Sequence, residues 1–330
     1  MMVVKREENR ARERRQETTA EPGNPAPFLL AHLSDFHLFS TAGSRLPDFS
    51  LKRLYGCLSW RWRRRHEHGD QVVLAMIDDL HRQRPSHIAV TGDLTHLGLP
   101  DEYRRAAEFL RRLGPPEQVA VIPGNHDAYA KSAWEKGRGL WAPYLAGDDG
   151  LPDGEEARAP FPFVRRRGEV CLIGLSTARP CPPGLATGVL GREQLQRLDV
   201  ILAERGARGQ CRVILIHHPP VPGVISWRKR LVDHRDFCGV LRRRGAELVL
   251  HGHAHHPSSV FVAAPAGGRV PVVGVPAATA FGRRPERRSE YNLYRIVRES
   301  QTWRISFKRR RYAIDSNDFS DRDGWRPLLP

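Results

Sequence analysis

Apolar residues along the chain form two kinds of pattern, which predict alternating strands and helices. Short continuous apolar runs, typical of buried strands, cover residues 28–38, 87–91, 118–122, 169–175, 212–216 and 247–250. Apolar residues at helical spacing mark 70–84, 101–113, 191–205 and 228–244. After residue 260 the runs at 270–275, 291–297 and 302–307 predict further strands. Strand–helix alternation followed by a series of strands favours an α/β protein with four layers, an α/β/β/α sandwich.

The two ends of the chain differ in composition from its middle. Residues 1–27 are rich in Arg, Glu and Pro and contain no apolar segment of the length that a secretory signal requires, so we expect a disordered basic tail. We expect one domain over 28–312, with a basic amphipathic insertion at 45–68, and a C-terminal tail over 313–330. All apolar runs are far shorter than the roughly 18–20 residues that cross a bilayer.

Cysteine content and net charge suggest a location and a class of ligand. The five cysteines are odd in number and form no CxxC pair, which favours free thiols in a reducing compartment. We therefore expect a cytoplasmic protein, and peripheral contact with the inner membrane surface is an alternative. The net charge of +16 attracts phosphorylated substrates, nucleic acid and anionic lipid about equally well.

Polar side chains follow five of the expected strands at the point where each strand ends. In chain order, these are Asp35-Phe36-His37, Gly92-Asp93, Gly124-Asn125-His126-Asp127, His217-His218 and Gly252-His253-Ala254-His255. Carboxyl ends of strands in open α/β sheets gather at one edge, where binding sites form. One such motif alone is more often an ordinary turn, but five in order indicate a metal site. Asp, His and Asn together suit Mn, Fe, Zn or Co, and Asp93 is a carboxylate able to bridge two ions.

These motifs resemble those of a known family, the calcineurin-like metallophosphoesterases. The resemblance runs over residues 29–255 through "LSDFH", "TGDLT", "PGNHD", "IHHPP" and "HGHAH". The residues of these motifs are also similar to those of the bacterial class III cyclic-nucleotide phosphodiesterase-like subgroup. It implies two central mixed sheets flanked by helices, with a dinuclear metal centre at the strand ends.

The resemblance also implies which residues bind the metals. One ion would be held by Asp35, His37, Asp93 and His255, and the second by Asp93, Asn125, His217 and His253. Of the two adjacent histidines, the family's ligand stands two residues before the proline. This position selects His217, and His218 is expected to have a supporting or structural role.

Three further residues near these motifs receive roles from the resemblance. His126 matches the family's non-ligand histidine, which contacts the phosphoryl oxygen and helps to protonate the leaving group. Asp127 would orient His126. His96 stands where purple acid phosphatases have a tyrosine ligand, which argues against that subgroup. An extra ligand, a substrate contact and a simple loop histidine all stay open for His96.

The expected activity is that of a metal-dependent hydrolase acting on phosphoric ester bonds. We expect a phosphodiesterase that cleaves a phosphodiester or pyrophosphate bond with a hydroxide bridging two divalent ions. One alternative is a membrane-surface pyrophosphatase acting on a nucleotide-linked lipid precursor. A non-catalytic interaction module of the same fold is another, which the complete ligand set and His126 disfavour. The expected partner is a phosphorylated small molecule or lipid; nucleic acid is not favoured, and the sequence does not predict the oligomeric state.

Two basic segments bear on the substrate. The segment 51–65 has a narrow apolar helical face with Lys and Arg on the rest. Docking on the core, contact with an anionic membrane and contact with nucleic acid all remain open for it. The segment 226–234 follows His217, and its residues Arg228, Lys229 and Arg230 are either substrate contacts at the mouth of the site or an ordinary helix start. Residues 281–288 add positive charge in an expected loop.

Overall fold

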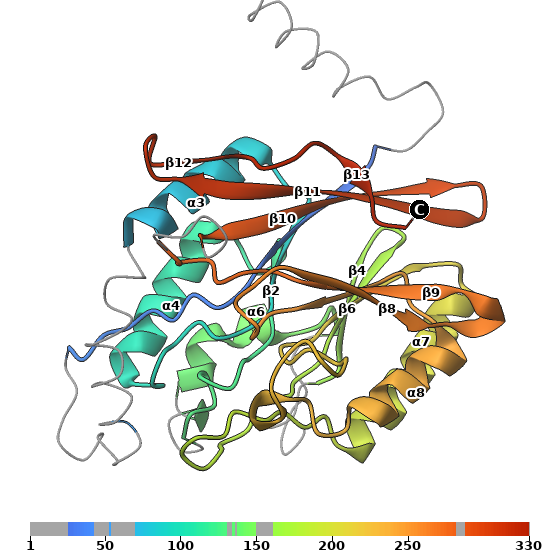
Figure 1. The fold of residues 1–330 in the computed structure, drawn as a ribbon, viewed down its shortest axis with the longest axis horizontal. Coiled ribbons are helices and arrows are strands. Elements are labelled where there is room, and N and C mark those ends of the chain that lie inside the picture. Colours follow the sequence, from blue (N-terminus) through green and yellow to red (C-terminus); the bar gives the residue numbers. More distant parts are fainter. Residues whose placement is uncertain are drawn as a thin grey trace, which may run out of the picture.

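Two β-sheets packed face to face form the centre of the molecule, and helices cover their outer faces (Figure 1). The structure is a computed structural model that describes residues 26–42, 53, 70–130, 134–135, 137–149, 161–281 and 288–329. Within these ranges no helix has the length and apolar character needed to cross a membrane. The expected α/β/β/α arrangement with two mixed sheets is confirmed. The expected tail at 1–27 lies outside the described residues, apart from its last two.

The first sheet combines the amino-terminal and carboxyl-terminal parts of the chain. Its order is β12 (Asp318–Asp321), β11 (Thr302–Ala313), β10 (Glu290–Glu299), β1 (Phe28–Leu33), β2 (His87–Val90) and β3 (Val119–Val121), and β13 (Arg326–Pro327) pairs with β11. The pairs β1–β2 and β2–β3 are parallel, whereas β10, β11, β12 and β13 join in antiparallel fashion. Residues 313–330, which we expected to be a tail, therefore contribute two short strands to this sheet.

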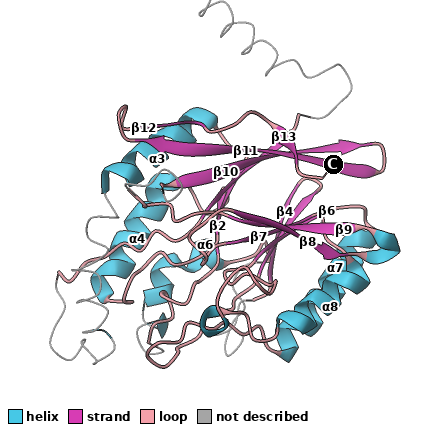
Figure 2. Cartoon of the chain, in the orientation of Figure 1, coloured by secondary structure: helices cyan, strands magenta, loops and turns pink. Residues whose placement is uncertain are grey.

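The second sheet has a parallel centre with antiparallel edges. Its order is β4 (Phe163–Arg167), β5 (Val170–Gly174), β6 (Cys211–Leu215), β7 (Leu248–His251), β9 (Arg269–Gly274) and β8 (Ser258–Ala263). Strands β5, β6, β7 and β9 are parallel, and β4 and β8 are the antiparallel edges. The helices α3 (Asp70–Gln83) and α4 (Pro100–Leu113) cover the first sheet, and α7 (Arg192–Ala207) and α8 (His234–Arg244) cover the second (Figure 2). Short helical turns are η3 (Arg138–Trp141), α6 (Ala142–Leu145), η5 (Trp227–Lys229) and η6 (Pro265–Gly267).

Alternate residues of the central strands pack on opposite faces of the second sheet. Leu172 and Val213 join the core that extends between the two sheets, whereas Ile173 and Ile214 join the core beneath α7 and α8. All four side chains have no exposed surface. Because both faces are buried, these strands are continuous apolar runs, and their carboxyl ends are held rigidly at one edge.

The helix that we expected over 228–244 begins later, at His234. The segment before it is a short 3₁₀ turn, and Arg230 after that turn is extended, with φ −72° and ψ 162°. The backbone carbonyls of Arg228 and Arg230 accept hydrogen bonds from the amides of Ala186 and Gly188, at 2.9 and 3.1 Å. The extended backbone at Arg230 interrupts the helix, and the hydrogen bonds to the neighbouring loop hold the segment in this non-helical path.

Candidate metal centre

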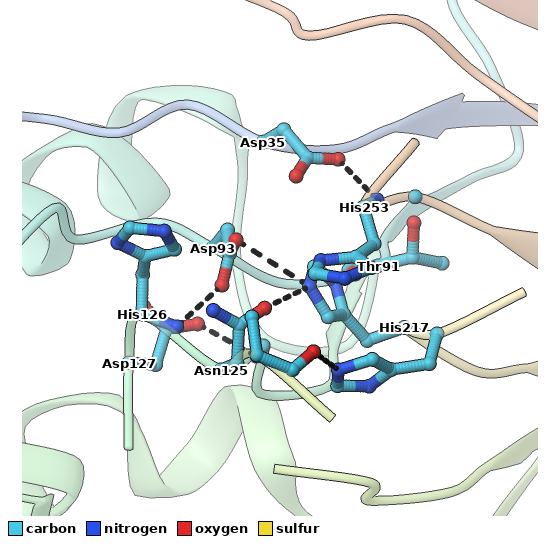
Figure 3. A network of polar contacts seen from close by, with 12 residues as sticks. Asp35, Thr91, Asp93, Asn125, His126, Asp127, His217 and His253 are labelled. Carbon is cyan, nitrogen blue, oxygen red and sulfur yellow. Dashed lines mark hydrogen bonds and ion pairs between the residues drawn. The ribbon is translucent and has the colours of Figure 1, made fainter. Parts of the chain in front are cut away.

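Loops that follow β1, β2, β3, β6 and β7 bring the expected metal-binding side chains together. Figure 3 shows five of them, Asp35, Asp93, Asn125, His217 and His253. Donor atoms of Asp35, His37, Asp93 and His255 all lie within 4.8 Å of one another, and so do those of Asp93, His217 and His253. The amide oxygen of Asn125 lies 3.3 Å from Nε2 of His217, which places it at the second group. The structure thus gathers all seven expected ligands into two groups that share the carboxylate of Asp93.

Five of these residues adopt left-handed backbone conformations that only glycine adopts easily. The φ angles are 60° at Asp35, 47° at His37, 55° at Asp93, 65° at His253 and 56° at His255. Such conformations cost on the order of 1–3 kcal/mol each and persist where the surroundings impose them. The amide of Asp35 donates to the Gly92 carbonyl at 2.9 Å, and the amide of His37 donates to the Asp93 carbonyl at 2.9 Å. The first two loops thereby hold one another in the conformation that turns their side chains inward.

Glycines directly before the functional residues allow the loops to approach closely. A Cβ atom at Gly124 would lie 2.1 Å from Oδ1 of Asp93, and one at Gly252 would lie 1.9 Å from Oγ of Ser34. Neither contact is sterically possible. The Gly-Asn and Gly-His pairs in the motifs are therefore required by packing between loops, independently of any chemistry.

The arrangement of the donor atoms fits divalent metal ions. The Nε2 atoms of His37 and His255 face one another at 3.1 Å, and Nε2 of His255 lies 3.1 Å from Oδ1 of Asp35. The buried atoms Oδ1 of Asp35 and Oδ2 of Asp93 are engaged only by imidazole nitrogens of the cluster within the described structure, Oδ1 by His255 and Oδ2 by His217 at 3.4 Å. Buried carboxylates are costly unless a cation neutralises them. A mixed set of imidazole nitrogens and carboxylate oxygens suits borderline divalent ions.

The cluster keeps its carboxylates ionised. Burial raises the pKa of Asp35 and of Asp93, but the neighbouring imidazoles outweigh it, chiefly His255 for Asp35 and His217 for Asp93. The pKa of both carboxyls is therefore below its usual value. Burial lowers the pKa of His217, but Asp93 outweighs that effect and raises it to about 9. Ionised carboxylates are the form that binds a metal.

The adjacent histidines at 217 and 218 have different surroundings. Nδ1 of His217 lies 2.6 Å from the carbonyl oxygen of Thr91, and its Nε2 lies 3.4 Å from Oδ2 of Asp93. Both ring nitrogens of His218 bond to loops outside the cluster, Nδ1 to the Thr177 hydroxyl at 2.6 Å and Nε2 to the Ala186 carbonyl at 3.1 Å. Burial lowers the pKa of His218 to about 3, with His217 as the second cause. His217 therefore faces the donor cluster, and His218 supports the structure around it.

His126 lies beside the first group of donors without belonging to the expected ligands. Its backbone amide donates to Oδ1 of Asp93 at 2.8 Å, and its ring Nδ1 donates to the carbonyl oxygen of His96 at 2.5 Å. The ring stands edge-on to His37, with 4.6 Å between the ring centroids. The half-buried imidazole is thus fixed at the margin of the cluster, with its orientation set by a backbone carbonyl.

Asp127, which we expected to orient His126, directs both carboxylate oxygens to backbone amides, and its expected role toward His126 stays a prediction. Its Oδ1 accepts from the Thr95 amide at 2.9 Å, and its Oδ2 accepts from the Gly124 amide at 2.9 Å. Burial, with a further contribution from Asp93, raises its pKa to about 7. Asp127 therefore ties the second loop to the third, and the carbonyl of His96 orients the catalytic candidate His126.

The loop that carries His96 is anchored by two residues that sequence reasoning missed. Glu102 accepts hydrogen bonds from the amides of His96, Leu97 and Leu99, at 3.2, 2.8 and 3.1 Å. Arg53 donates to the carbonyl of Leu97 at 3.0 Å and to the carbonyl of the next residue at 2.6 Å. An acidic residue at the third position of α4 is a known helix-start signal and could have identified Glu102. Arg53 is the only described residue of the segment 51–65.

His96 itself is buried, and its ring stacks on that of His126, with 5.2 Å between centroids. Donor atoms of His37, His96 and His126 also lie within 4.8 Å of one another. This position is compatible with an extra ligand or a substrate contact, and the choice remains a prediction.

The basic stretch after His217 borders the cluster through its backbone. Arg228, Lys229 and Arg230 are exposed, and the carbonyl oxygen of Lys229 lies 3.1 Å from Nε2 of His253. With Nε2 engaged by this carbonyl, Nδ1 is the ring nitrogen of His253 that remains as a candidate donor atom. Most of the other basic stretch, 282–287, lies outside the described residues.

Comparison with known proteins supports the same class of site. The chain is 28% identical over 268 residues to a cAMP/cGMP dual specificity phosphodiesterase of Mycobacterium tuberculosis, covering 78% of this chain and 70% of the relative. It is also 28% identical to a glycerophosphodiester phosphodiesterase of Enterobacter lignolyticus over 195 residues, 59% of this chain and 58% of the relative. Among solved structures, a dimetal phosphatase from Danio rerio has a similar fold, with a TM-score of 0.57 at 14% identity, over 91% of this chain and 98% of the other.

The match to a protein family covers most of the domain. Residues 28–257, which include every expected ligand, match the calcineurin-like phosphoesterases, and the protein is accordingly a metal-dependent hydrolase of phosphoester bonds. The sequence motifs, the fold and the donor cluster agree, and the chain belongs to the calcineurin-like phosphoesterase family.

Proposed function

We propose that the protein is a phosphodiesterase with a dinuclear metal centre. One ion would be held by Asp35, His37, Asp93 and His255, and the second by Asp93, Asn125, His217 and His253. The observation that carries this proposal is the pair of donor groups that share Asp93. A shared carboxylate is what a site with two ions about 3.5–4 Å apart requires.

The side chains around the centre have distinct tasks in this proposal. Two divalent ions, when bound, would activate water and neutralise the phosphoryl oxygens. His126 holds a proton on Nδ1 against the His96 carbonyl, so its other nitrogen is the one that would deliver a proton to the leaving oxygen. Asp127 keeps the loops of Asp93 and Asn125 in register through the amides of Thr95 and Gly124.

The turn at Trp227–Lys229 supports a substrate that has a second group beyond the scissile phosphate. The guanidinium of Arg228 lies 5.4 Å from the centroid of the Trp227 ring, and Trp227 is 63% exposed. The Lys229 carbonyl joins the turn to His253. We propose that Arg228, Lys229 and Arg230 contact the alcohol side of a diester substrate, such as a nucleoside or a head group. Both curated relatives named above are phosphodiesterases by name, which agrees with a diester.

A metal count combined with a substrate panel tests the proposal. The Mn-loaded protein is expected to bind two ions per chain and to hydrolyse cyclic nucleotides or a generic diester faster than a monoester. Asp93→Asn should lose both ions and all diesterase activity, whereas Asp78→Asn, at an exposed position on α3, should retain both. Two ions retained by Asp93→Asn, or a preference for monoesters, would refute it. A nucleotide-diphospho-lipid in the panel tests the membrane pyrophosphatase alternative, which rests on sequence alone.

A further inference from the structure

A cleft lies between the two sheets at the edge opposite the metal centre. Its volume is approximately 1140 Å³, comparable with the roughly 300–1,000 Å³ of small-molecule sites. Its lining includes Arg295, which pairs with Leu29 near the amino end of β1, whereas Asp35 follows the carboxyl end of that strand. Figure 1 shows the turn between β10 and β11 and the strand β9 on the side where the marked C-terminal end lies. The proposed phosphodiesterase function leaves this cleft without a role.

Arginine dominates the charge of this cleft. Its lining contains Arg212, Arg244, Arg269, Arg295, Arg304 and Arg326, against the carboxylates of Glu247 and Glu299. Four of these arginines form ion pairs. Arg212 pairs with Glu247, and Arg244 pairs with Asp199. Arg304 pairs with Glu299, and Arg326 pairs with Asp323. Arg269 and Arg295 have no carboxylate partner among the described residues. The cleft therefore has two positive charges that the described part of the chain does not neutralise.

Aromatic rings hold the two unpaired guanidinium groups in place. Arg295 of β10 lies over the Trp325 ring, 4.4 Å from its centroid, and Arg269 of β9 lies over the Phe261 ring, at 5.1 Å. Stacking on a ring face leaves the N–H groups in the guanidinium plane available, and it orients them before any ligand binds. Because β10 and β9 belong to different sheets, the two groups approach the cleft from its two walls.

We infer that this cleft is a second binding site, for a phosphorylated small molecule about the size of a nucleoside diphosphate. Two oriented, unpaired guanidinium groups suit phosphate oxygens, which accept paired N–H bonds. The cleft is too large for inorganic phosphate alone, and the Trp303 ring in its lining offers an apolar surface for the rest of the ligand. This site is separate from the proposed catalytic centre, and its existence does not depend on the proposed activity.

Photoaffinity labelling with 8-azido-ADP locates such a site directly. The full-length, metal-loaded chain is labelled, digested and mapped by mass spectrometry. We expect labelled peptides from β9, from the β10–β11 hairpin or from residues 325–329, in addition to any label near the metal centre. The variant Arg269→Gln/Arg295→Gln should lose the cleft label at least tenfold, since hydrogen bonds to charged groups are strong, and should keep its diesterase rate.

Two further variants control for misfolding and for the general effect of removing an arginine from the cleft. Arg269→Glu changes an exposed residue at the start of β9, so loss of label in this variant reflects charge rather than misfolding. Arg304→Gln removes a cleft arginine that is already paired with Glu299, and it should retain most of the label. Absence of label in the cleft of the parent protein, or equal labelling of the parent and the double variant, would overturn the inference. Excess ADP should remove the label, and label that persists would also overturn it.

Discussion

The imidazole Nδ1 of His217 lies 2.6 Å from the backbone carbonyl oxygen of Thr91, at the carboxyl end of β2. A carbonyl oxygen only accepts, so Nδ1 carries the proton and Nε2 is the atom that faces Asp93 at 3.4 Å. Asp93 stands two residues after Thr91 on the same loop. One loop therefore supplies the shared carboxylate and also fixes which nitrogen of His217 points toward it.

Substitution of the two adjacent histidines should have different effects on metal content. His217→Ala removes a donor of the proposed second site, so we expect about one ion per chain instead of two. His218→Gln should retain two ions, because the His218 ring bonds to Thr177 and Ala186 instead. Elemental analysis of dialysed protein measures both. Equal metal content in the two variants would show that the assignment is wrong.

His126→Ala should separate metal binding from turnover. The His126 ring lies beside the donors and its tautomer is set by the His96 carbonyl, so both ions should remain. General acid catalysis contributes roughly 10²–10⁴-fold, and we expect kcat to fall by that order for an alkyl diester. A p-nitrophenyl diester needs no proton on its leaving group, so its rate should fall much less.

The control for this variant is His81→Ala, which changes an exposed histidine in the last turn of α3. It should leave both rates unchanged. Equal losses of rate on the two diesters would contradict the acid role of His126, whatever the size of the loss.

The ligand cluster was predictable from sequence because its signal is carried by side chains at strand ends. Asp35, Asn125 and His253 each follow an apolar run that forms a strand, and parallel strands bring such positions to one edge. The support of His126 was not predictable, because the group that orients it is the backbone carbonyl of His96. Every residue has a backbone carbonyl, so the sequence does not indicate which carbonyl will lie near the His126 ring, and only the fold shows it.

The late start of α8 has the same kind of cause. Helical spacing of the apolar residues extends back to Arg228, but the carbonyls there bond to another loop. Tertiary hydrogen bonds override local helix propensity at this point. The sequence of the segment alone does not show which loop will bond to it.

Gly124→Ala should disrupt the centre without introducing any polar group. The added Cβ would lie 2.1 Å from Oδ1 of Asp93, so one of the two loops must move. We expect loss of both ions and of activity, and a decrease in the free energy of unfolding. Gly139→Ala is the matched control, because a Cβ there meets no atom within 4 Å. Isothermal titration with Mn²⁺ measures the effect, and unchanged affinity in Gly124→Ala would contradict the close packing of these loops.

Glu102 should make the stability of the protein depend on pH. Burial raises its pKa to about 7, even though backbone amides favour the ionised form. In the unfolded chain the pKa is near 4.5. Between these values the folded protein holds a proton that the unfolded chain has released. The contribution of Glu102 to the unfolding free energy should therefore fall as pH rises from about 4.5 to 7, by up to about 3 kcal/mol, and be constant above that range.

Urea unfolding at pH 5 and pH 8 tests this prediction when the parent protein is compared with Glu102→Gln. Glutamine does not titrate, so the difference in unfolding free energy between the two proteins should shift in favour of the variant as pH rises. Titration of the metal ligands is common to both proteins and cancels in this difference. Glu108→Gln, at an exposed position of the same helix, should show no such shift. A parent–variant difference that is the same at both pH values would mean that Glu102 is already ionised at pH 5, with the amides of His96, Leu97 and Leu99 compensating its burial.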